Sequence, residues 1–60
     1  MKRADQLYAK LYVERKRLMS LNARENREDI NQLGLELKAL VDTGDVSQKA
    51  IDLAPYLPWR

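Results

Sequence analysis

Apolar residues recur at helical spacing in two separate stretches of this 60-residue chain, and no other feature restricts the fold as strongly. The first stretch has no glycine or proline between Ala4 and Leu21 and is rich in strong helix formers. Its apolar residues have the three-and-four spacing of one helical face. They are Ala4, Leu7, Leu11, Leu18 and Leu21. We expect a helix over about residues 3–21, with Tyr8, Tyr12 and Met19 widening its apolar face.

The second stretch repeats this spacing and ends at a glycine. Its apolar residues are Ile30, Leu33, Leu37, Leu40 and Val41. Gly44 suits the left-handed position that closes many helices, so we expect a helix over about residues 26–43. Gly34 lies beside the apolar face, where its missing side chain would let another helix come close.

The two apolar faces do not continue one another. Extending the first heptad register past Leu21 reaches Glu25 and Glu28, whereas the second face begins two residues out of phase. A turn that resets the phase therefore fits better than one long helix. Asn22 and Asn26 are each followed three residues later by an acid, as in a capping box. We expect two antiparallel helices.

The rest of the chain predicts a short helix and a tail. Asp45 or Ser47 is suited to cap a helix over about residues 46–54. Its inward face is expected to hold Val46, Ala50, Leu53 and Leu57. Pro55 should end this helix, because the residue before a proline avoids the α region. Residues 55–60 then form a tail.

These elements predict an all-α fold, namely an antiparallel helical hairpin plus a short third helix and an ordered Pro/Trp C-terminal tail. We expect a single small domain over residues 1–60. A chain of this length buries only about 60% of its unfolded surface. Such a chain relies on well-formed helices or on self-association, so a homodimer is a reasonable expectation.

The composition argues against several classes of function. The chain has no cysteine and no histidine, which removes disulfides, the usual zinc ligands and the commonest general base. It has no glycine-rich phosphate loop, so we expect no enzyme activity, cofactor or metal. No apolar run approaches the roughly 20 residues of a membrane span, and no signal-peptide core follows Lys2 and Arg3. We expect a cytoplasmic protein.

Two helices of this length cannot bury so broad an apolar face by themselves. The third helix and the tail, or a second copy of the chain, must cover the rest. We therefore expect a non-catalytic regulatory or adaptor protein that acts through protein–protein contacts on this Leu/Tyr face. The expected interface residues are Tyr8, Leu11, Tyr12, Met19, Tyr56 and Trp59, with Glu14 and Arg15 fixing orientation.

The segment LAPYLPWR at positions 53–60 has two interpretations. Pro55 and Pro58 restrict its backbone, so it loses less entropy on ordering. Either Leu57 and Trp59 lie back across the hairpin and complete its core, or the aromatic side chains stay exposed as anchors for a partner.

Glu14 also has two interpretations, because it occupies the apolar face between Leu11 and Leu18. It is either a polar device that sets register or partner choice, or a carboxylate at the edge of the face beside Lys10 or Arg17.

Basic residues offer an alternative function. Residues 1–24 contain seven basic and two acidic side chains, and residues 25–60 contain four and seven, so the two halves attract each other. Clustered basic residues can neutralise phosphates, with Tyr8 or Tyr12 adding stacking. The candidate nucleic-acid contacts are Arg15, Lys16, Arg17, Arg24 and Arg27. Three consecutive helical residues fan over about 200° of the surface, however, which is more typical of a solvated face.

The second and third predicted helices also resemble a helix-turn-helix arrangement in outline, with Gly44 in the turn. Its contact residues would be Ser47, Gln48 and Lys49. Asp52 would face phosphate unfavourably on so short a helix, and a helix C-cap explains the glycine more simply.

Overall fold

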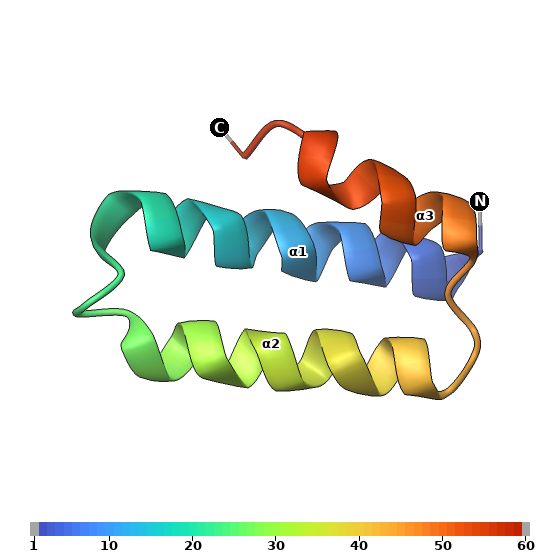
Figure 1. Ribbon diagram of the computed structural model, residues 1–60, viewed down its shortest axis with the longest axis horizontal. Coiled ribbons are helices and arrows are strands. Elements are labelled where there is room, and N and C mark those ends of the chain that lie inside the picture. Colours follow the sequence, from blue (N-terminus) through green and yellow to red (C-terminus); the bar gives the residue numbers. More distant parts are fainter. Residues whose placement is uncertain (1, 60) are drawn as a thin grey trace.

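The computed structural model describes residues 2–59, which form three α-helices and one short 3₁₀ helix (Figure 1). These elements are α1 (Arg3–Asn22), α2 (Arg27–Asp42), α3 (Gln48–Leu53) and η1 (Ala54–Tyr56). Helix α1 is central: α2 packs along one side of it, and α3 with η1 lies along another (Figure 1). The predicted all-α hairpin with a short third helix is confirmed. Positions 1 and 60, which the predicted domain and tail include, lie outside the described residues.

The turn between α1 and α2 begins at Asn22. The Asn22 side-chain Oδ1 accepts a hydrogen bond from the Glu25 N–H at 3.2 Å, and the Asn22 carbonyl accepts one from the Asn26 N–H at 3.1 Å. Asn26 holds the N-cap position of α2, but its side chain makes no capping hydrogen bond. The predicted asparagine cap therefore closes the turn at Asn22 instead of capping the second helix.

Helix α2 ends as the sequence predicts. Gly44 has φ = +76° and donates its N–H to the Val41 carbonyl at 3.0 Å. The Thr43 hydroxyl donates to the Leu40 carbonyl at 2.7 Å. These bonds satisfy carbonyls that the last helical turn leaves without an intrahelical donor.

The start of α3 is attached to α1 through Asp5. The Ser47 N–H donates to Asp5 Oδ1 at 2.8 Å, and the Ser47 hydroxyl donates to Asp5 Oδ2 at 3.0 Å. The same hydroxyl accepts a hydrogen bond from the Ala50 N–H at 3.2 Å, so Ser47 is also the N-cap of α3. Asp5 is only 7% exposed. Ser47 thus caps one helix and joins it to another.

This attachment sets the rotation of α3 about its axis. With Ser47 facing α1, the residues four and seven positions later face it too. Ile51 and Ala54 pack on the core, while Leu53 is 50% exposed. The predicted inward face was therefore wrong at Leu53.

The junction between α3 and η1 also differs from the prediction. Ala54, the residue before Pro55, has φ = −52° and ψ = −43°, which is the α region. Ala54 is fully buried in a cluster with Tyr8 and Leu37. Pro55 lies in the first turn of η1, where a helix does not need its missing N–H. Packing overrides the steric preference at Ala54, and the chain becomes extended only at Leu57.

Gly34 on α2 lies close to the Arg15 side chain of α1. The Arg15 Nε–H donates to the Ile30 carbonyl at 3.0 Å. A Cβ on Gly34 would lie 3.3 Å from Arg15 Nε, which is a tight contact. Gly34 on α2 therefore makes room for the Arg15 guanidinium group. The sequence had suggested that it makes room for another helix.

Acid should test the Asp5 attachment. The hydrogen bond from the Ser47 N–H, assisted by its hydroxyl, holds the pKa of the Asp5 carboxyl below its ordinary 3.8, although burial acts in the opposite direction. A lower pKa in the folded chain means that the ionised carboxylate stabilises the fold above pH 3.8. This contribution is lost as the pH falls from there through the folded-state pKa.

We therefore expect the free energy of unfolding of the wild type to fall more steeply on acidification than that of Asp5→Asn, whose amide does not titrate. Denaturant titrations at a series of pH values measure this. Parallel profiles for the two proteins across the acid range would contradict the role of Asp5.

Alanine at the two glycines should have opposite effects. Gly34→Ala should raise the free energy of unfolding by about 0.5–1 kcal/mol, because helix propensity improves and the flexible Arg15 can move slightly. Gly44→Ala should lower it by about 1 kcal/mol, because an L-residue is strained at positive φ. Thermal unfolding should show these changes as shifts of about 4–8 °C per kcal/mol. Shifts in the same direction would contradict this assignment.

Candidate protein-binding site

A hollow of about 290 Å³ lies between α1 and η1. We call it the α1–η1 hollow, and it is lined by Tyr12, Arg15, Lys16, Met19 and Pro55. It combines an aromatic ring, a thioether and two cationic side chains. It therefore offers both apolar and charged contacts to a ligand.

Helical spacing and the packing of η1 bring these side chains together. Tyr12, Lys16 and Met19 are four and three residues apart, so they lie on one strip of α1. Ala54 holds η1 against the core, and the Lys16 ammonium donates to the Pro55 carbonyl at 2.7 Å. Both contacts fix the position of Pro55 over α1.

The two cations of the hollow are not neutralised within the described part of the chain. Arg15 and Lys16 each donate to a backbone carbonyl, and neither has a carboxylate oxygen within 4.0 Å among residues 2–59. A carbonyl accepts a hydrogen bond without cancelling the charge. The guanidinium has five N–H donors and the ammonium three, so donors are left over for an external anion.

Tyr56 directly follows Pro55, which lines the hollow, and it is 84% exposed. Leu57 and Trp59 are only partly exposed. Each of the two interpretations of the tail therefore fits part of it. Tyr56 faces solvent, whereas Leu57 and Trp59 are partly covered.

The structure brings some predicted interface residues together and separates others. Tyr12, Arg15 and Met19 share the hollow, whereas Tyr56 follows its Pro55 along the chain without lining it. Tyr8 instead lies in the core at 7% exposure, where burial and, to a lesser degree, Tyr12 raise the pKa of its hydroxyl. The Tyr8 and Tyr12 ring centroids are 6.0 Å apart and tilted by 37°, a favourable aromatic pair.

Leu11 and Glu14 lie on the other side of α1, where they line surface pockets together with residues of α2. Glu14 is exposed, and its Oε1 lies 3.7 Å from Arg17 Nη1. This geometry matches a carboxylate at the edge of the apolar face. A surface pair of this kind contributes little stability by itself.

The five candidate nucleic-acid contacts are dispersed. Arg15 reaches α2, Lys16 reaches η1 and Arg17 pairs with Glu14. Arg24 and Arg27 are exposed, in the turn and at the start of α2 respectively. These side chains do not form a continuous strip for a phosphate backbone.

The three residues considered for a helix-turn-helix contact are also occupied in part. Ser47 is bound to Asp5, and the Gln48 side chain donates to Asp52 Oδ1 at 2.9 Å. Lys49 is exposed on a helix of six residues. The sequence did not point to Asp5, and it did not predict that Lys16 would bind the backbone of the C-terminal segment. Their spacing offers a signal for both residues. Asp5 is three residues before Tyr8 and Lys16 is four after Tyr12, so helical periodicity places each beside a tyrosine of the apolar face.

Residues 2–59 lack two further kinds of feature. No helix in this range is both long and apolar enough to cross a membrane. No group of three or more acidic, histidine or cysteine side chains there is arranged to bind a metal ion. Comparison with known proteins gave no match to a family model, to a curated protein or to a solved structure.

The position of η1 should depend on Ala54. Ala54→Leu should overpack the cluster with Tyr8 and Leu37 and lower the free energy of unfolding by about 1–3 kcal/mol. It should also move η1 and change the emission of Trp59. Leu53→Ala, at the half-exposed neighbouring position, is the matched control and should have a much smaller effect on both. Equal effects of the two substitutions on Trp59 emission would contradict the role of Ala54.

Proposed function

We propose that this chain is a non-catalytic adaptor or regulatory protein of the cytoplasm that binds a protein partner at the α1–η1 hollow. One observation supports this most strongly: Arg15 and Lys16, which have no carboxylate partner within residues 2–59, border an apolar hollow, and the residue that follows its Pro55 is a tyrosine that is 84% exposed. Tyrosine and arginine dominate the energetics of protein interfaces.

The chemistry of the hollow suggests what the partner offers. Tyr12, Met19 and Pro55 provide apolar surface for an aliphatic or aromatic side chain. The methionine thioether adapts to different shapes and suits an aromatic group. The free donors of Arg15 and Lys16 suit a carboxylate next to that side chain. The partner segment therefore combines an apolar residue with neighbouring Asp or Glu.

A library of displayed random peptides, selected on the immobilised chain, tests this proposal. Enriched peptides should carry an apolar residue next to Asp or Glu. Tyr56→Ser should weaken the binding of an enriched peptide by about tenfold or more, equivalent to about 1.4 kcal/mol. Lys16→Gln removes the charge but keeps a donor, so it should weaken binding and reduce its salt dependence.

Leu35→Ser is the matched control, because Leu35 is an exposed apolar residue on α2 that does not line the hollow. It should leave the affinity unchanged. The proposal is wrong if selection enriches no acidic peptides, or if Tyr56→Ser and Leu35→Ser have the same effect on binding.

A further inference from the structure

A second surface feature lies between α1 and α2, away from the α1–η1 hollow. Three pockets adjoin there: the first two share Leu7 and Leu40, and the second and third share Glu36. No residue of α3 or η1 lines any of them. We call this continuous surface the leucine groove, and its apolar floor consists of Leu7, Leu11, Leu18, Leu33, Ala39 and Leu40.

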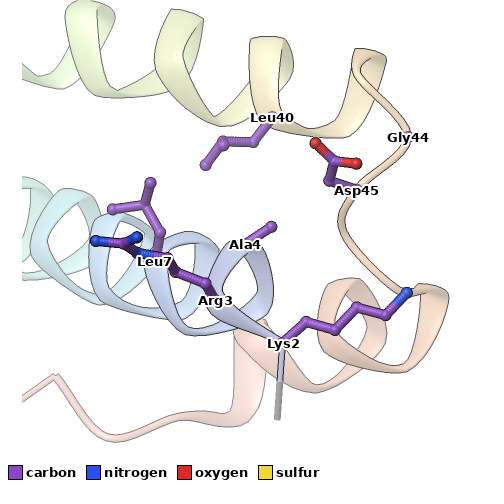
Figure 2. A pocket seen from close by; sticks show the side chains of 7 residues that line it. All are labelled: Lys2, Arg3, Ala4, Leu7, Leu40, Gly44 and Asp45. Carbon is purple, nitrogen blue, oxygen red and sulfur yellow. The ribbon is translucent and has the colours of Figure 1, made fainter.

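The leucine groove is open because α3 covers only one side of the broad apolar face of α1. Leu7 and Leu40 point towards each other from facing helices, and Arg3 extends beside Leu7 (Figure 2). Leu7 is nevertheless 44% exposed. The other leucines of the groove, Leu11, Leu18, Leu33 and Leu40, are only partly buried.

The two edges of the groove differ in charge: the α1 edge is basic apart from Glu14, and the α2 edge is acidic. On α1, Arg3, Lys10 and Arg17 recur every seven residues and therefore lie on one strip. Arg3 lines the groove and Arg17 contacts Glu14, which also lines it, so this strip is the α1 edge. On the α2 edge, Asp29 and Glu36 both line the groove.

These edge charges are mostly unpaired within one chain. Arg17 pairs with Glu14 at 3.7 Å, and this is the one ion pair among residues 2–59. Lys10, Asp29 and Glu36 therefore have no opposite charge within 4.0 Å in the described range. The basic and acidic edges lie on different helices and do not pair with each other within residues 2–59, so a second copy with its edges reversed would bring opposite charges together.

Opposite residues along the groove can be identified from the pockets. Leu7 shares a pocket with Leu40, Leu11 with Glu36, and Leu18 with Asp29. Lys10 is thus level with Glu36, and Arg17 is level with Asp29. A two-fold axis parallel to the helices keeps these levels and places α1 of one copy over α2 of the other. A two-fold axis across the helices would instead place the basic edges on each other.

We propose that the leucine groove is the interface of a symmetric homodimer in which α1 of each copy lies antiparallel over α2 of the other. Lys10 then faces Glu36 of the second copy, and Arg17 faces Asp29 of the second copy. The leucines of both grooves form the core of a four-helix bundle. A standard interface buries about 800 Å² per partner, roughly a sixth of the 4770 Å² surface of this chain.

Sedimentation velocity over a wide range of concentration tests this proposal on the full chain. The wild type should show a monomer–dimer equilibrium. Lys10→Glu with Arg17→Glu places acids at the two α1 positions that would face Asp29 and Glu36, and Asp29→Lys with Glu36→Lys places bases at the two α2 positions that would face Lys10 and Arg17. Each double variant should weaken self-association by more than about tenfold in Kd, because like charges then face each other. Circular dichroism verifies that both variants are helical.

Mixing the two double variants is the decisive step. In the mixture every acidic edge can face a basic edge, so heterodimers should form with an affinity close to that of the wild type. A monomeric wild type, a dimer that tolerates both double variants, or a mixture that stays monomeric would each overturn the proposal. None of these results affects the α1–η1 hollow, because peptide binding there is measured separately.

Discussion

The carboxylate of Asp5 is the group on which the placement of the α3–η1 segment depends. A six-residue helix is far too short to be stable by itself in water, so its tertiary attachments decide whether it forms. Ser47 provides the main attachment by donating two hydrogen bonds to Asp5 while capping α3. The resulting rotation turns Ala54 into the core. Ala54 is the first residue of η1. The contact between Asp5 and Ser47 therefore also positions the α1–η1 hollow.

Periodicity was sufficient to predict the hairpin, because each long helix shows its apolar face within its own sequence. It was insufficient for α3, where the deciding interaction joins residues 42 positions apart. Ser47 has a recognisable capping role, but nothing local indicates that an aspartate on another helix binds it. The conformation of Ala54 was unpredictable for a similar reason. The residue before a proline avoids the α region, but complete burial of the Ala54 side chain outweighs this local steric preference.

The sequence predicted which residues belong to the candidate site better than it predicted how they are arranged. Tyr12, Arg15, Met19 and Tyr56 were all expected at an interface, and the structure brings the first three to the α1–η1 hollow. A helical wheel gives the width of an apolar face without showing which part of it a neighbouring helix covers. Helix α3 covers the tyrosine side, which buries Tyr8 and leaves the leucine side open.

The central position of α1 has a consequence for motion within the molecule. Both α2 and the α3–η1 segment pack on α1, along separate sides (Figure 1). Local units of a protein can open with different free energies, although Leu37 of α2 and Ala54 of η1 meet in one buried cluster with Tyr8. The α3–η1 segment is the shorter of the two, so we expect it to open first. Its release would break the hydrogen bonds to Asp5 and from Lys16 and would give solvent access to Tyr8. The state that remains would be the α1–α2 hairpin with its tyrosine side exposed.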